Sequence, residues 1–107
     1  MPTLSLAATR IAIVGAGLIG RAWAISFARA GADVRLWDQH APTSAAAMDF
    51  IAAILPELER NGLLNDAPAA VLARCSVAPS LAEALQGAAH IQENTPEVLA
   101  TKIEVFR

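Results

Sequence analysis

Three glycines with the spacing GxGxxG, Gly15, Gly17 and Gly20, limit the folds open to this chain more than any other feature. A short apolar run rich in β-branched residues, 10–14, precedes them, and a segment with helical periodicity, 18–30, follows. In such a strand–turn–helix unit the first glycine permits the tight turn, and the second lets the backbone approach a pyrophosphate. The third allows the helix to pack closely on the strand. The motif predicts a dinucleotide-binding fold; a glycine-rich turn without a ligand is the alternative.

The rest of the chain alternates between short apolar runs and segments with helical periodicity. Strands are predicted at 10–14, 33–37, 74–78 and 89–92, and helices at 18–30, 42–60, 80–86 and from Thr95 onward, with one helical turn after Asp66. Pro56 lacks an amide hydrogen, so we expect it to kink or end the second helix. Strands that alternate with helices form mostly parallel sheets. We therefore predict the α/β class, a doubly wound Rossmann sheet of which about four strands are present.

The first helix is expected to pack its apolar residues on the sheet. They form two neighbouring stripes: Leu18, Ala22 and Ile25 in one, and Ile19, Trp23, Phe27 and Ala30 in the other. Arg21 and Arg29 lie outside both stripes, and Gly31 is well placed to end the helix. Trp23 and Trp37 are therefore predicted to be packing residues rather than platforms for a ligand.

Asp38 is the first residue after the second predicted strand, 18 positions beyond Gly20. An acid at this point can accept hydrogen bonds from the hydroxyl groups of an adenosine ribose. It would also repel a 2′-phosphate, and the residues that follow, Gln39 and His40, offer no arginine or lysine to bind one. Arg35 lies inside the strand and is expected to face solvent or pair locally. Asp38 thus favours NAD over NADP, although it could simply open the following turn.

Composition and charge exclude several classes of partner. Of the 107 residues 55% are hydrophobic, but no uncharged run approaches the roughly 20 residues of a membrane-spanning helix. The net charge of −2, with scattered basic residues, offers no patch for nucleic acid. The N-terminus lacks the features of a secretory signal, and one cysteine cannot form an internal disulfide. We expect a cytoplasmic protein that binds neither membranes nor nucleic acids.

The remaining reactive side chains are interpreted as structural. Cys75 falls in a predicted strand and is expected to be a small buried hydrophobic residue. His40 follows Asp38 in a loop and His90 opens the fourth predicted strand, so both are expected to be structural or exposed. No spacing of potential ligands is typical of a metal site. Three classes of protein remain open at this point: flavoproteins, methyltransferases and NAD-dependent dehydrogenases.

The second half of the chain separates these classes. Residues 80–106 read SLAEALQGAAHIQENTPEVLATKIEVF, in which an EAL-x-x-A helix, a strand, a PE helix start and a K-x-x-x-F segment follow in order. This stretch resembles the NAD-binding N-terminal domain of the 3-hydroxyacyl-CoA dehydrogenase family, and the resemblance covers about 10–107. GLIGRAWA at 17–24 and HIQE at 90–93 are most similar to the branch with lambda-crystallin (L-gulonate 3-dehydrogenase) and carnitine dehydrogenase.

The resemblance implies which residues bind NAD. They are Gly15, Ala16, Gly17, Leu18, Ile19 and Gly20 at the pyrophosphate, Asp38 with Gln39 at the adenine ribose, and Asn94, Glu97 and Lys102 towards the nicotinamide. For the last two an ordinary alternative exists, because Glu97 is a favourable acid in a first helical turn and Lys102 could be solvated. The family's catalytic histidine, polarised by a glutamate, follows the K-x-x-x-F segment. Catalytic residues are therefore expected only downstream of Arg107.

The resemblance also implies the reaction of the parent protein. It would oxidise a 3-hydroxyl group with NAD as hydride acceptor, as in fatty acid metabolism, on an acyl-CoA or a small hydroxy acid, and would be a homodimer. Four predicted strands, where such folds generally have six, suggest that 1–107 are the N-terminal part of the domain. The rest of it and a helical C-terminal domain would be absent. An FAD-binding oxidoreductase and a non-catalytic crystallin-like protein are the alternatives.

Overall fold

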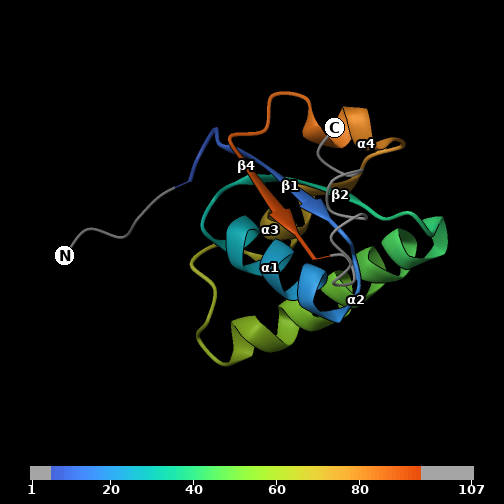
Figure 1. Ribbon diagram of the computed structural model, residues 1–107. Coiled ribbons are helices and arrows are strands. Elements are labelled where there is room, and N and C mark those ends of the chain that lie inside the picture. Colours follow the sequence, from blue (N-terminus) through green and yellow to red (C-terminus); the bar gives the residue numbers. More distant parts are fainter. Residues whose placement is uncertain (1–5, 95–107) are drawn as a thin grey trace.

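The computed structural model describes residues 6–94, which form one sheet flanked by helices (Figure 1). The elements are β1 (Arg10–Val14), α1 (Leu18–Arg29), β2 (Asp33–Trp37), α2 (Ala41–Arg60), α3 (Pro68–Ala73), β3 (Cys75–Val77), α4 (Leu81–Leu85) and β4 (His90–Glu93). The predicted alternation of strands and helices is confirmed. β1 and β2 have the predicted bounds, β3 is one residue shorter at each end, and β4 is displaced by one residue. The helix predicted from Thr95 lies outside the described residues.

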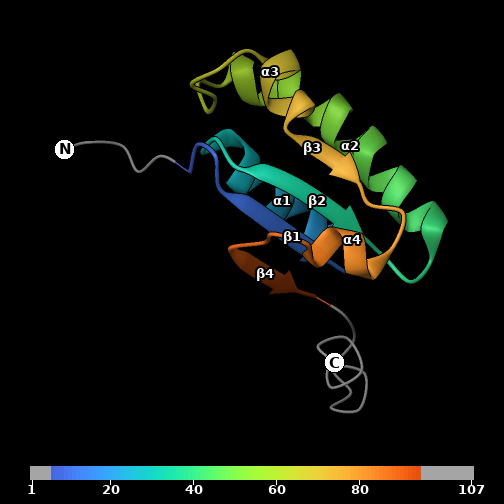
Figure 2. The same cartoon turned by 90° about the horizontal axis from the view of Figure 1, so that it is seen from above.

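All strand pairings in the described sheet are parallel, in the order β3-β2-β1-β4 (Figure 2). β1 therefore lies between β2 and β4, and Ile11 is opposite both Val34 and His90. In Figure 1, α1 and α2 lie below the strands and α4 lies above them, while α3 packs against α2. Helices on both faces of a parallel sheet confirm the predicted doubly wound α/β class.

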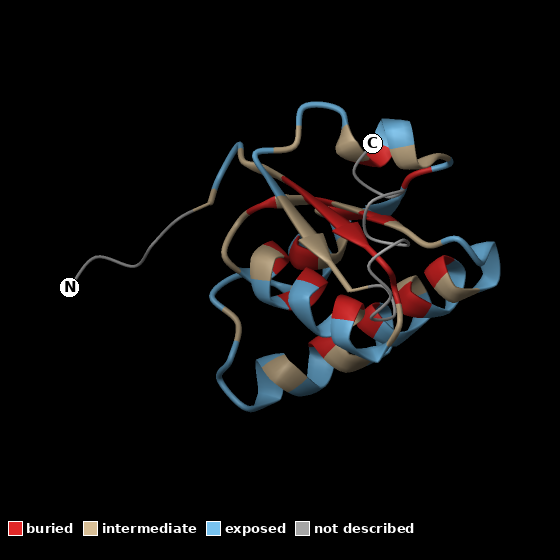
Figure 3. Ribbon diagram, viewed as in Figure 1, coloured by how far each residue is buried: buried red, intermediate tan, exposed pale blue. Residues whose placement is uncertain are grey.

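The core lies between the sheet and the layer of α1 and α2. Ile11 and Ile13 of β1 and Leu36 of β2 are at most 2% exposed, and they belong to one buried cluster that includes residues of both helices. In Figure 3 the buried residues are concentrated in the central strands β1 and β2 and on the sheet-facing sides of these helices. Burying each such side chain away from water stabilises the folded state by about 1.5–3 kcal/mol. The continuous apolar run of β1 correctly predicted a strand buried on both faces.

The side of α1 that faces the sheet differs from the predicted stripes. The buried residues of this helix are Gly20, Ala24, Ile25 and Ala28. Leu18 is 76% exposed, Ile19 68% and Trp23 42%, so the prediction that these three pack on the sheet is wrong. The reason is steric: a helix lying close to a strand needs small side chains at the contact. Trp23 instead stacks on Phe27, with 5.7 Å between ring centroids.

Helix α2 continues through Pro56 to Arg60, so Pro56 does not end it. Pro56 and Ala52, whose carbonyl loses its helical partner, are both exposed, and water can hydrate the carbonyl. A different side of the helix, with Ile51 and Leu55, is buried against the sheet. Within residues 6–94 no helix is long and apolar enough to cross a membrane.

Candidate dinucleotide site

The glycine turn connects the carboxyl end of β1 to the N-terminus of α1. Gly15 has φ +95°, a left-handed conformation that favours glycine, and its amide donates to the Trp37 carbonyl at 2.8 Å. Gly17 is the N-cap of α1 and provides no side chain to accept the first helical amides. The first turn of α1 also contains no acid, so no side chain of its own neutralises the positive end of the helix. This arrangement is suited to binding an anion.

The second and third glycines have different surroundings. A Cβ on Gly17 would meet nothing within 4 Å, so the space next to this backbone is open. A Cβ on Gly20 would overlap the carbonyl group of Gly15, so this position requires glycine for the helix to approach the turn. The two roles expected from the motif, access at Gly17 and close packing at Gly20, are thus both present in the geometry.

Asp38 follows β2 and lies beside the glycine turn. Its Oδ2 accepts a hydrogen bond from the Ala16 amide at 2.8 Å, and its Oδ1 accepts one from the His40 amide at 2.8 Å. The second bond is the turn-opening role considered as an alternative. The first places the carboxylate against the glycine turn, residues 15–17, which is the candidate phosphate loop. Both functions are compatible because a carboxylate has four lone-pair sites. Gln39 and His40 are exposed.

Asn94 follows β4 and supports the turn from the other side. Its backbone amide donates to the Val14 carbonyl at 2.8 Å, and its side-chain Nδ2 donates to the carbonyls of Gly15 at 3.4 Å and Gln92 at 3.3 Å. β2 and β4 flank β1, while the helices after β1 and β3 lie on opposite faces. Such a switch point is where open α/β sheets bind ligands at the carboxyl ends of their strands.

Arg21 is a site residue that the sequence interpretation missed. Its Nη2 donates to the Ala16 carbonyl at 3.3 Å, and its guanidinium lies over the ring of Phe50 in α2, 5.4 Å from the centroid. Its place outside the apolar stripes gave no indication of this contact. A usable signal was its position directly after the third glycine, within one turn of the phosphate loop.

The exposed side of α1 forms an open, shallow surface patch that begins at the glycine turn. Its lining residues are Leu18, Ile19, Ala22, Trp23 and Ser26. The patch is apolar, and its end at the glycine turn contains the two predicted cofactor contacts Leu18 and Ile19. These residues are therefore accessible beside the phosphate loop rather than buried under the sheet.

Other predicted residues lie away from this end of the sheet or outside the described chain. Cys75 is buried at the start of β3, and burial raises the pKa of its thiol to about 11, with Asp33 adding to and Arg74 opposing the shift.

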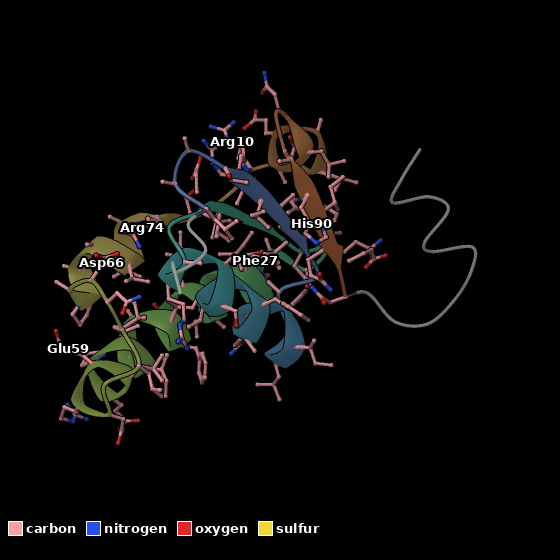
Figure 4. The ribbon with its side chains drawn as sticks, turned by 90° about the vertical axis from the view of Figure 1, so that its left-hand side faces the viewer. Arg10, Phe27, Glu59, Asp66, Arg74 and His90 are labelled. Atoms are coloured by element: carbon pink, nitrogen blue, oxygen red, sulfur yellow. The ribbon has the colours of Figure 1, made fainter. Side chains whose placement is uncertain are left out.

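His90, at the start of β4, is exposed and its ring lies 5.6 Å from that of Phe27 (Figure 4). Glu97 and Lys102 lie outside the described residues. Arg35 pairs locally, as predicted, its Nε being 3.7 Å from Asp33 Oδ1.

Comparison with known protein families is consistent with this geometry. The profile described as "3-hydroxyacyl-CoA dehydrogenase, NAD binding domain" matches residues 10–107. A lambda-crystallin homolog of Mus musculus is 41% identical over 104 residues, which are 95% of this chain and 33% of that protein. An L-carnitine dehydrogenase of Streptomyces griseus is 40% identical over 97 residues, covering 91% of this chain and 28% of that protein.

Solved structures give the same fold. The 3-hydroxybutyryl-CoA dehydrogenase of Escherichia coli K12 superposes with a TM-score of 0.81 at 28% identity, over 92% of this chain and 21% of that one. A diketoreductase superposes with a TM-score of 0.80 at 24% identity, which supports the fold alone. The chain spans about a third of the length of the curated relatives it matches.

Proposed function

This chain belongs to the NAD-binding domain family of the 3-hydroxyacyl-CoA dehydrogenases, and we propose that it is the cofactor-binding part of an enzyme that oxidises a 3-hydroxyl group. The cofactor of the domain is NAD. When bound, NAD supplies the acceptor for the hydride that leaves the alcohol carbon. The FAD-binding alternative is thereby set aside.

The observation that carries the proposal is the meeting of the glycine turn, Asp38 and Asn94 at one end of the sheet. The turn offers helix amides and open space at Gly17 for the diphosphate. Asp38, fixed by two backbone amides, would accept hydrogen bonds from the adenine ribose. Gln39 would border the adenine side, and Asn94 the nicotinamide ribose.

The chain's contribution to the reaction is binding and orientation. For Glu97 and Lys102, near the nicotinamide end, the support is the family resemblance. A histidine elsewhere in the parent enzyme would take the hydroxyl proton. His40 and His90 are unsuitable for that role. The backbone amide of His40 is bonded to Asp38, which keeps this residue on the adenine-ribose side. His90 starts β4 and lies at the opposite end of the strand from Asn94.

A small 3-hydroxy acid is the substrate class that the comparisons favour. The relatives near 40% identity include an L-carnitine dehydrogenase, whereas the structure of a 3-hydroxybutyryl-CoA dehydrogenase is 28% identical. A fatty acyl-CoA remains the second candidate. A panel of free 3-hydroxy acids and 3-hydroxyacyl-CoA esters, assayed with the full-length enzyme by NADH absorbance, would separate them. Turnover of the CoA esters alone would contradict the proposal.

We further propose a cytoplasmic homodimer for the parent enzyme. Cys75 of this chain is buried and forms no disulfide, which suits a reducing compartment, and the dimer is proposed on the family resemblance. Cell fractionation and light scattering of the full-length protein would check the two statements separately. Recovery in a secreted fraction, or a monomeric mass, would contradict the corresponding one.

Calorimetric titration of the 107-residue chain tests cofactor binding directly. We expect the affinity for NAD to exceed that for NADP by about ten-fold or more, because Asp38 repels a 2′-phosphate. Asp38→Asn should weaken NAD binding and narrow the difference between the two cofactors. Asp49→Asn, an exposed acid on α2, is the matched control and should change neither. Tighter binding of NADP, or a bound flavin in the purified protein, would contradict the assignment.

A further inference from the structure

Both backbone polar groups of Ala16, its N–H and its carbonyl, are held by charged side chains. Its amide donates to Asp38 Oδ2 at 2.8 Å, and its carbonyl accepts from Arg21 Nη2 at 3.3 Å. Ala16 is itself fully buried and lies between the first two glycines of the motif. The residue at the centre of the phosphate loop is therefore fixed from β2 on one side and from α1 on the other.

Arg21 is placed by more than this one hydrogen bond. Its guanidinium lies over the Phe50 ring, so the side chain joins α1, the glycine turn and α2. Its Nε is buried without a hydrogen-bond partner. Within residues 6–94 no carboxylate lies within ion-pair distance of it. A positive charge that is not compensated locally is thus kept next to the phosphate loop.

We propose that Arg21 is a positioning residue for the diphosphate of the bound dinucleotide, acting through the Ala16 carbonyl. This inference rests on the proposed NAD binding. By holding that carbonyl on the α2 side, Arg21 keeps the turn in the conformation that leaves Gly17 open to the phosphates. Its charge also adds to the positive end of α1.

The flanking glycines explain why such a constraint is needed. Gly15 adopts φ +95° and Gly17 has no neighbour within 4 Å of its Cβ position, so neither restricts the turn by side-chain packing. Glycine loses more conformational entropy on ordering than any other residue. A loop that is already ordered before the ligand arrives does not lose this entropy on binding, and so binds more tightly.

The test compares ligands with and without a diphosphate on the 107-residue chain. Arg21→Met should weaken ADP and NAD binding by roughly ten-fold, the value of a hydrogen bond to a charged group, and adenosine binding by less than about two-fold. Arg21→Lys should recover part of the loss. Arg29→Met, an exposed arginine later in α1, is the control and should bind all three ligands normally. Binding is followed by nuclear magnetic resonance titration of the labelled chain.

The outcomes distinguish this inference from the proposed function. If the unmodified chain fails to bind NAD, the proposed function is wrong and the inference is overturned with it. If the unmodified chain binds NAD and Arg21→Met binds ADP equally well, or loses adenosine and ADP to the same extent, only the role of Arg21 is overturned. Should Arg21→Met fail to fold, Phe50→Leu is the second variant, because it removes the ring beneath the guanidinium. It should weaken ADP binding more than adenosine binding, with a smaller loss of affinity than Arg21→Met. An equal effect of Phe50→Leu on adenosine and ADP would also overturn the role of Arg21.

Discussion

Gly20 of α1 packs so closely on Gly15 that a Cβ on Gly20 would overlap the Gly15 carbonyl group. The same carbonyl oxygen accepts a hydrogen bond from Asn94 Nδ2 at 3.4 Å. The first helix, the end of the first strand and the end of the fourth strand therefore meet at one backbone oxygen. The third glycine of the motif is required by this packing and not by contact with a ligand.

Alanine substitutions at the second and third glycines should affect different properties: NAD binding at Gly17 and stability at Gly20. Gly20→Ala places a methyl group against backbone that cannot move aside, so we expect a loss of at least ~3 kcal/mol in the free energy of unfolding. Gly17→Ala meets open space, so stability should change by less than about 1 kcal/mol. The new methyl would nevertheless occupy the approach of the diphosphate and weaken NAD binding about ten-fold or more. Urea denaturation and calorimetry measure the two quantities; a stable Gly20→Ala variant would contradict the packing argument.

The corrected orientation of α1 can be tested with one substitution at two positions. Ala24 is fully buried against the sheet, whereas Ala22 is exposed two residues earlier. Ala24→Leu should overpack the contact and cost about 1–3 kcal/mol of stability. Ala22→Leu should change it by less than about 0.5 kcal/mol. A larger loss for Ala22→Leu than for Ala24→Leu in the denaturation curves would mean that the helix faces the sheet as the apolar stripes had predicted.

Cys75 should make the fold sensitive to alkaline pH. Its thiol has an ordinary pKa of 9.0, and burial raises the pKa to about 11 in the folded chain. Between these values the unfolded chain releases a proton that the folded chain keeps, so raising the pH favours unfolding. The loss approaches roughly 2–3 kcal/mol above pH 11, at 1.36 kcal/mol for each pKa unit.

The control for this pH effect is Cys75→Ala, which should be less stable at neutral pH yet lose the steep alkaline decline. The chain contains no tyrosine, so few other groups titrate in that range. Denaturant titrations at several pH values measure the effect. A decline of equal size in Cys75→Ala would assign it to another group.

Arg74 connects α3 to the end of α1. Its Nη1 donates to the Ala28 carbonyl at 2.8 Å and its Nη2 donates to Asp66 Oδ2 at 2.7 Å (Figure 4). Arg74→Met should cost about 1–2 kcal/mol, because a carbonyl in the last helical turn loses a charged donor. Asp66→Asn removes only a partly exposed ion pair and should cost less than about 1 kcal/mol, with a smaller effect in high salt. Thermal denaturation at two salt concentrations compares them, and an Asp66→Asn loss as large as that of Arg74→Met would contradict the assignment to the Ala28 carbonyl.

Local patterns in the sequence were enough to predict most of the elements. β1, β2 and the glycine turn are specified by short runs in which each residue type has a clear backbone preference. Ser80 also caps α4 as its spacing predicted, since its Oγ accepts from the Glu83 amide at 3.1 Å. The parallel sheet followed from the alternation of these elements.

The incorrect or missed features depend on contacts that hydrophobic periodicity does not contain. The apolar stripes of α1 gave no weight to Gly20, Ala24 and Ala28, although small size is what decides which side of the helix approaches β1. Arg21 was overlooked because its partners, Ala16 and Phe50, come from different elements. In the same way, the interruption predicted at Pro56 did not take account of a solvent-exposed helix side.

The position of β1 inside the sheet has a consequence for the order of folding. Arg10 in β1 bonds Asp33, 23 residues later, and Gly15 at the strand's end bonds Asn94, 79 residues later. Pairings between residues so far apart raise the contact order and slow folding, because loop-closure entropy is lost before the contact forms. During synthesis the glycine turn therefore leaves the ribosome long before its support from β4 exists. The dinucleotide site is completed late, so a ligand bound there preferentially stabilises chains whose sheet has already closed around β1.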